Sequence, residues 1–154
     1  MIAVLQRVCR AVCAVDQAVS GECGQGLFIL LCAVAGDTEE DCRLLADKIA
    51  RLRIFSDVNG KMNLSLADTG FGALAVPNFT LAANYAHGNR PDFLASEKPP
   101  RAETLFLHFV SLLRERLGEE RVGTGVFGAD MQIALTADGP VTIVMESDKL
   151  KKKK

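Results

Sequence analysis

The sequence predicts an α+β fold with a largely antiparallel sheet and two main helices. Short runs rich in Val, Ile and Leu alternate with turn residues, and two longer segments carry apolar residues at helical spacing. The predicted order is strands, helix, strands, helix, strands, which is typical of this class. The chain has 154 residues, 49% of them hydrophobic and 24% charged. A chain of this size and composition folds as one domain.

The N-terminal third predicts strands. Runs of Val and Ile are broken at Asp16-Gln17, and several Gly residues follow before the next apolar run. We expect a strand over residues 2–8, a hairpin over residues 11–20 and a strand over residues 27–34.

Two segments predict helices. Thr38 is a good N-cap residue, Asp41 stands three places later, and the acidic first turn suits the helix dipole. Apolar spacing then extends this helix to about Arg53. A second helix is expected over residues 101–117, which follow two Pro residues, carry apolar residues every three or four places and end before a Gly.

The middle of the chain predicts two strands, over residues 61–66 and 73–81, and a long loop over residues 83–100. The second strand carries Pro77, Asn78 and Thr80, and such polar content is unusual for a buried strand. Long loops in compact domains are commonly functional.

The C-terminal third predicts a hairpin. A strand over residues 121–127 comes first, and the segments 131–136 and 141–146 then alternate apolar and other residues on either side of a break at residues 137–140. This pattern places Gly139-Pro140 at a hairpin tip.

The charge balance excludes a general nucleic-acid coat protein. The chain carries 18 Lys and Arg against 19 Asp and Glu; without Lys151–Lys154, 14 basic residues face 19 acidic ones, a net charge of −5. Non-specific affinity for phosphates needs a basic surplus, so any RNA contact must be local. We expect residues 1–147 to form the domain and residues 148–154 to form a basic tail.

The five Cys residues are odd in number and all fall within the first 42 residues. Their spacing lacks the tight pairs of a zinc site, and no secretory signal precedes them, so we expect a reducing, cytoplasmic compartment and no metal. The apolar runs are too short to span a membrane.

Conventional catalytic motifs are missing. Residues 123–128 match G-x-G-x-x-G, but a strand pattern follows where a dinucleotide site needs a helix. The chain has two His residues, His87 and His108, and neither has a recognisable partner motif for a Ser or Cys nucleophile.

Several segments match one family pattern, in order and without large gaps, from residue 1 to about residue 147. They are IAVLQRV at 2–8, KIARLRIF at 48–55, GKMNLSL at 60–66, FTL at 79–81, RPDF at 90–93, FGADMQ at 127–132 and DGPVT at 138–142. In these segments the chain resembles the D-aminoacyl-tRNA deacylases.

The resemblance implies a cytoplasmic homodimer with a barrel-like sheet and no cofactor. Enzymes of this family cleave the ester that joins a D-amino acid, or glycine mischarged on tRNA(Ala), to the terminal adenosine of tRNA, and so proofread chirality in translation. The implied partner is the 3′ end of an aminoacyl-tRNA.

The resemblance also assigns the residues that select the substrate. In the family the Gly-Pro dipeptide, here Gly139-Pro140, is cis and enters the pocket of the partner subunit, where its carbonyls hold the amino group and leave no room for an L side chain. Arg7 resembles the arginine that helps to fix this dipeptide, and Met131 the methionine near it. Thr142 belongs to the same segment as a supporting residue.

Phe79-Thr80 matches the floor of the family's pocket, where main-chain N–H groups can stabilise an oxyanion. Thr80 is a candidate nucleophile, but the family is better described by assistance from the ribose 2′-OH of the substrate. An activated ester needs only positioning, an oxyanion hole and water, which agrees with the missing triad.

Three site positions depart from the family pattern. Pro77-Asn78 stands where the family has Ser-Gln, and Ala137 stands where it has Asn. Two alternatives therefore stay open: a diverged tRNA deacylase with relaxed stereospecificity, and a non-catalytic RNA-end-binding or interaction module of the same fold.

Overall fold

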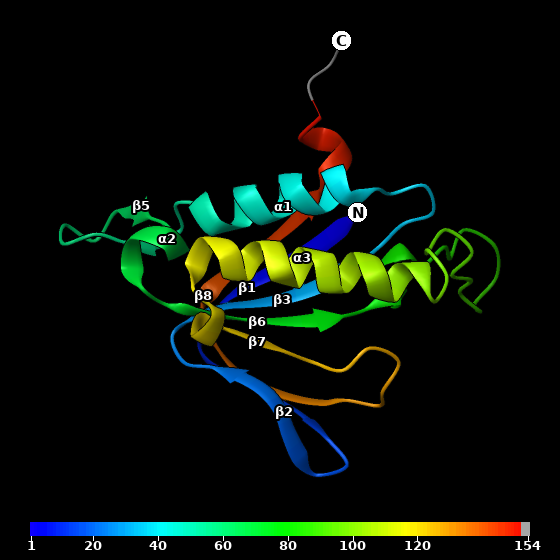
Figure 1. Ribbon diagram of the computed structural model, residues 1–154, viewed down its shortest axis with the longest axis horizontal. Coiled ribbons are helices and arrows are strands. Elements are labelled where there is room, and N and C mark those ends of the chain that lie inside the picture. Colours follow the sequence, from blue (N-terminus) through cyan, green and yellow to red (C-terminus); the bar gives the residue numbers. More distant parts are fainter. Residues whose placement is uncertain (152–154) are drawn as a thin grey trace.

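Most strands belong to one curved, mixed sheet (Figure 1). The computed structural model describes residues 1–151. The strands follow the order β2-β1-β3-β6-β7, and β8 pairs with the other edge of β1. Their bounds are β1 Ile2–Val15, β2 Ala18–Cys23, β3 Gly26–Cys32, β6 Gly72–Pro77, β7 Val122–Thr124 and β8 Gln132–Glu146. A separate ribbon pairs β4, Phe55–Ser56, with β5, Met62–Leu64.

The two long helices, α1 (Glu39–Arg51) and α3 (Arg101–Leu117), lie side by side across one face of the sheet (Figure 1). Both predicted helices are thus confirmed to within two residues. The larger core fills the space between these helices and the sheet, and its fully buried members include Leu5, Ile29, Leu45, Ile49 and Phe109. Burying one such side chain contributes about 1.5–3 kcal/mol. None of the helices within residues 1–151 is long and apolar enough to cross a membrane.

The sheet curls until β2 and β7 nearly meet, which gives the barrel-like form. A Cβ atom on Gly21 of β2 would lie 2.3 Å from the carbonyl oxygen of Thr124, and one on Gly123 of β7 would lie 2.6 Å from that of Glu22. Only glycine permits this backbone approach. A smaller core, with Val8, Phe28, Leu74 and Val76 among its members, packs separately from the larger one. The α+β class is confirmed, although β3-β6 and β6-β7 pair in parallel.

In the N-terminal third, the structure confirms the predicted turn at Asp16-Gln17 but differs from the prediction in the strand that precedes it. Residues 2–8 and 11–15 form one strand, β1, because β8 pairs along nearly its whole length, on both sides of the expected gap. Asp16 and Gln17 form the turn to β2, with positive φ angles of 49° and 66°.

The strand predicted over residues 73–81 is too long. It ends at Pro77, and residues 79–82 form a short 3₁₀ helix, η1 (Phe79–Ala82). Pro77 has no N–H to donate to a further ladder bond, and the side chain of Asn78 accepts from the N–H of Thr80, which favours a turn. The remaining short helical segments are α2 Leu66–Thr69, η2 Glu119–Arg121 and η3 Ser147–Lys149.

The predicted C-terminal hairpin is wrong. The segments 131–136 and 141–146 lie end to end in one strand, β8, because both pair antiparallel with the single long strand β1. The pairing runs from Gln6 with Thr142 to Val8 with Ala137, so the four residues 138–141 face only Arg7. Gly139-Pro140 therefore lies in a bulge of β8 rather than at a hairpin tip, and its peptide bond is cis.

The predicted basic tail falls partly outside the described residues, since residues 152–154 are not described. Within the described part, residues 147–149 form η3, and the ammonium of Lys151 lies 2.8 Å from the carboxylate of Asp41 on α1 and 2.7 Å from that of Asp148. Lys151 is therefore tied to the domain.

Candidate functional site

An apolar cavity of about 490 Å³ opens where β3 and β6 end, beside the start of α3. The loop before α3 and the turn before β8 complete its wall. Its lining residues are Met1, Leu31, Cys32, Ala33, Pro77, Asn78, Phe79, Ser96, Glu97, Lys98, Pro99, Ala102, Phe106, Phe127, Gly128, Ala129 and Met131. The size and mostly apolar lining are those of a small-molecule site.

Asn78 shapes the wall of the cavity. Its N–H donates to the carbonyl of Leu31 at 2.8 Å, which ties the end of β6 to β3. Its side-chain oxygen accepts from the N–H of Thr80 at 3.2 Å and from the hydroxyl of Thr80. Both polar groups of Thr80 are therefore engaged, and Thr80 itself is exposed and lies outside the lining.

Phe79 supplies the free donor of this segment. Within residues 1–151, no hydrogen-bond acceptor is found for its backbone N–H, whereas the N–H groups of Asn78 and Thr80 are used and Pro77 has none. Its ring is 57% exposed and stands edge-on to Phe93, with ring centroids 5.1 Å apart. A main-chain N–H without a partner beside a cavity can bind a carbonyl oxygen or an oxyanion.

The cavity wall offers no activated nucleophile. Burial raises the pKa of the Cys32 thiol to about 11, so this thiol stays protonated at neutral pH. The carboxylate of Glu97 lies 3.4 Å from the guanidinium of Arg101. Neither His87 nor His108 lines the cavity. Across residues 1–151, no group of three or more His, Cys, Asp or Glu could hold a metal ion.

The β8 bulge forms a second feature, and Arg7 holds it. The Nε atom of Arg7 donates to the carbonyl of Asp138 at 3.1 Å and lies 3.0 Å from its carboxylate. A terminal nitrogen of the same guanidinium donates to the carbonyl of Ile54 at 2.7 Å, beyond the end of α1. Arg7 is 12% exposed in its side chain, so the residue before Gly139-Pro140 is fixed against the body of the protein.

The structure brings together only some of the predicted site residues. Pro77, Asn78, Phe79 and Met131 line the apolar cavity, and Met131 packs close to Gly125. The other predicted residues, Arg7, Thr80, Ala137, Gly139, Pro140 and Thr142, lie outside it. Gly139-Pro140 and Ala137 are exposed along β8, as is Thr142. Within one chain, the bulge and the cavity are therefore separate.

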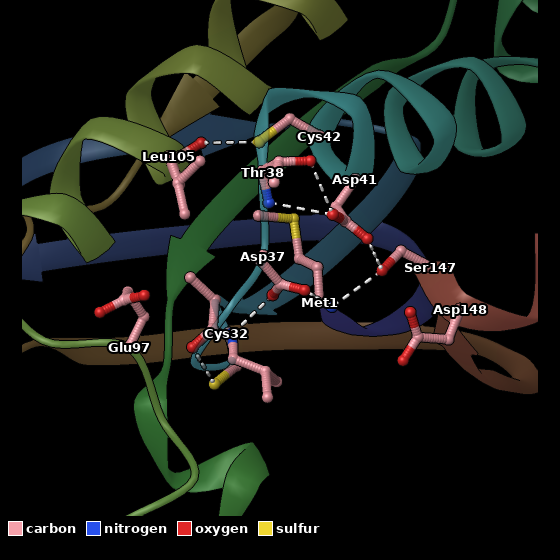
Figure 2. A network of polar contacts seen from close by, with 12 residues as sticks. Met1, Cys32, Asp37, Thr38, Asp41, Cys42, Glu97, Leu105, Ser147 and Asp148 are labelled. Carbon is pink, nitrogen blue, oxygen red and sulfur yellow. Dashed lines mark hydrogen bonds and ion pairs between the residues drawn. The ribbon is translucent and has the colours of Figure 1, made fainter. Parts of the chain in front are cut away.

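A buried polar network borders the cavity at Met1 (Figure 2). The Met1 ammonium lies 2.7 Å from the carboxylate of Asp37 and donates to the hydroxyl of Ser147 at 2.8 Å. That hydroxyl donates in turn to Asp41 at 2.6 Å. Burial alone would raise the pKa of Asp41, but hydrogen bonds from Lys151, Ser147 and Thr38 outweigh it and lower this pKa. The network thus holds one wall of the cavity in place.

Sequence reasoning missed most of the cavity wall. Phe127, Gly128 and Ala129 belong to a segment that matched the family pattern but were given no role, and Ser96 to Pro99 fell within the loop predicted to be functional. Met1 had no local signal, because it reaches the cavity only through pairing of β1 with β3.

The comparisons with known proteins agree over nearly the full chain. The model of the D-Tyr-tRNA(Tyr) deacylase family matches residues 4–146. A protein of Jannaschia sp. (strain CCS1), "D-aminoacyl-tRNA deacylase", is 52% identical over 147 residues, which cover 96% of this chain and 99% of that protein. A protein of the same name from Janthinobacterium sp. (strain Marseille) is 49% identical, covering 95% and 97%.

Two solved structures share the fold. The "c-Myc DNA Unwinding Element Binding Protein" has a TM-score of 0.90 and 37% identity, covering 95% of this chain and 98% of that one. A "probable eukaryotic D-amino acid tRNA deacylase" has a TM-score of 0.82 at 16% identity, covering 94% and 98%. The family model and the relatives at about half identity establish that the chain belongs to the D-Tyr-tRNA(Tyr) deacylase family.

Proposed function

We propose that this protein hydrolyses the ester bond of D-aminoacyl-tRNA, and of glycine mischarged on tRNA(Ala), as chiral proofreading in translation. The observation that carries the proposal is a cavity that, among the described residues, has a Phe79 N–H without a partner and no activated nucleophile, in a chain of this family. Such a site suits an ester that is already activated and needs positioning rather than covalent catalysis. Since charged tRNA is used in the cytoplasm, this function places the protein there.

In the proposed mechanism the terminal adenosine and the ester occupy the apolar cavity. Water attacks the ester carbonyl carbon, and the Phe79 N–H stabilises the oxyanion that forms. The ribose 2′-OH of the substrate assists proton transfer as the bond to the 3′ oxygen breaks, so that the 3′ oxygen leaves with a proton. Thr80 takes no direct part in the reaction, because its N–H and its hydroxyl both donate to Asn78.

We assign selection of the D enantiomer to Gly139-Pro140 of a second subunit. The bulge of β8 is exposed, is held by Arg7 and does not reach the cavity of its own chain. In a homodimer it would enter the partner's cavity, where its carbonyls would bind the substrate's amino group and exclude an L side chain. Ala137 and Thr142, at the ends of the bulge, would shape its presentation.

The test is incubation of the protein with D-Tyr-tRNA, L-Tyr-tRNA and Gly-tRNA(Ala). Rapid cleavage of the D and glycyl esters alone supports the proposal. Cleavage of the L ester points instead to relaxed stereospecificity, and no cleavage of any ester points to a non-catalytic module. A D-Tyr ester on a terminal 2′-deoxyadenosine should be cleaved far more slowly, because the assisting hydroxyl is missing.

Thr80→Val separates the proposed mechanism from covalent catalysis. The change replaces the hydroxyl with a methyl group of similar size, so kcat/KM for the D ester should stay within a few-fold of the wild-type value. A loss of several orders of magnitude, as follows removal of a catalytic nucleophile, contradicts assistance by the substrate alone.

A further inference from the structure

The geometry points to a second RNA contact, at the tip of the loop over residues 85–91. We infer that Tyr85 and Arg90 of this tip bind the unpaired nucleotides of the tRNA that precede its terminal adenosine. The assignment rests on the proposed function for the identity of the RNA, but its test does not require catalysis.

The base of the loop lies beside the apolar cavity. The loop projects beyond the N-terminal end of α3 (Figure 1). Asn84 and Asp92 close it through two backbone hydrogen bonds of 2.8 and 2.9 Å and a side-chain bond of 3.0 Å. Just past this closure, Phe93 contacts Phe79 of the cavity wall. An RNA strand that leaves the cavity on this side would therefore meet the tip.

Tyr85 offers an aromatic face without a structural role in the core. Its side chain is 79% exposed, and it is the only Tyr in the chain. Unpaired bases stack on such rings largely regardless of sequence. This suits a substrate end that is shared by tRNAs.

Arg90 offers a free cation at the same tip. Within residues 1–151 it makes no ion pair or hydrogen bond, while nearby Asp92 is engaged by Asn84 and by the N–H of Leu94. Because the chain without its last four lysines carries a net charge of −5, a phosphate contact needs such a local cation. Stacking and a cation together are the usual means of binding single-stranded RNA.

The experiment measures binding of uncharged RNA hairpins to the full chain by fluorescence anisotropy. One hairpin ends in an unpaired 3′ strand that terminates in adenosine, and the other has a blunt end. We expect Tyr85→Ala to weaken binding of the first hairpin at least about fivefold and Tyr85→Phe to retain it. Arg90→Gln should weaken it and reduce the salt dependence by about one phosphate contact, a slope change of about 0.7.

Matched controls are Arg51→Gln and Val58→Ala. Arg51 is an exposed arginine on α1 that forms no ion pair with residues 1–151, and Val58 is a fully exposed side chain in the β4-β5 turn. Both should bind as the wild type does. Equal losses on the blunt hairpin, unchanged binding in Tyr85→Ala and Arg90→Gln, or a changed oligomeric state in these variants would each overturn the assignment.

The two proposals can fail separately. If the wild type cleaves no ester but loses RNA binding in the Tyr85 and Arg90 variants, the contact stands and the proposed catalysis fails. If it cleaves D esters and the variants bind RNA as the wild type does, the catalysis stands and the contact fails.

Discussion

Asn78 is the residue on which the cavity wall depends. Its side-chain oxygen accepts two bonds from Thr80, and its N–H ties η1 to β3. Removing the acceptor leaves the N–H of Thr80 without its partner and loosens the backbone that presents the Phe79 N–H.

We expect Asn78→Ala to lower the free energy of unfolding by about 1 kcal/mol and to reduce kcat/KM for the D ester. Asn78→Asp keeps an oxygen acceptor at the same place and should retain most of the stability. Urea denaturation of the three proteins measures the difference. If Asn78→Ala unfolds at the wild-type urea concentration, the side-chain bonds do not stabilise η1.

The Asp41 carboxylate predicts a dependence of stability on pH. Its pKa is lower in the folded chain than in the unfolded one, where it is about 3.9. The ionised form is therefore favoured by folding, so this contribution is fully present above pH 4 and is lost as the pH falls through the folded-state value.

Asp41→Asn should be about 1–3 kcal/mol less stable than the wild type at pH 7, because the hydrogen bonds that the carboxylate accepts from Lys151, Ser147 and Thr38 are weakened or lost. This difference in the free energy of unfolding should become steadily smaller below pH 4. Asp148→Asn, at an exposed carboxylate, is the control and should show a much smaller gap. A gap for Asp41→Asn that is independent of pH in urea unfolding would contradict the assignment.

Among the elements, the β2-β7 closure of the barrel depends on glycine. Gly21 and Gly123 allow the two backbones to approach without hydrogen-bonded pairing in the sheet. We expect Gly21→Ala to cost about 2 kcal/mol or more, because its Cβ would meet the backbone of Thr124 and no flexible side chain can yield.

Gly24 is the matched control for this change. It lies just beyond the end of β2, and a Cβ there would meet nothing within 4 Å. Gly24→Ala should stay within about 0.5 kcal/mol of the wild type. Equal stability of Gly21→Ala and Gly24→Ala in thermal unfolding would show that the barrel opens at little cost.

Elements with local signals were predicted well. The Thr38 cap with Asp41 fixed the start of α1, and apolar spacing fixed α3. The hairpin prediction for the C-terminal third was wrong, because a hairpin and a single bulged strand show the same alternation of apolar and other residues. Only the length of the partner strand β1 distinguishes the two. Only a small part of the cavity wall was predicted, because the segment from Pro77 to Phe79 carries a local signal, while Met1 and Phe106 reach the cavity only through tertiary packing.

At the scale of the whole molecule, the two parts of the proposed site, the β8 bulge and the apolar cavity, are separate within one chain. The bulge at Gly139-Pro140 lies on β8, whose only sheet partner within residues 1–151 is β1, and β8 also exposes Ile133 and Val144. The proposed function requires a second copy to pack so that each bulge reaches the other chain's cavity. The proposed selectivity therefore requires two chains.

Complementation between inactive variants tests this arrangement. Pro140→Ala alters the bulge and leaves the cavity intact, while Ala129→Trp fills the cavity and leaves the bulge intact. Each variant alone should lose cleavage of the D ester. Mixed in equal amounts and allowed to exchange subunits, they should recover roughly a quarter of the wild-type activity per chain, since half of the dimers are mixed and each has one intact site. Light scattering checks that each variant is still a dimer. If each chain instead builds its site from its own bulge and cavity, the mixture is as inactive as its components.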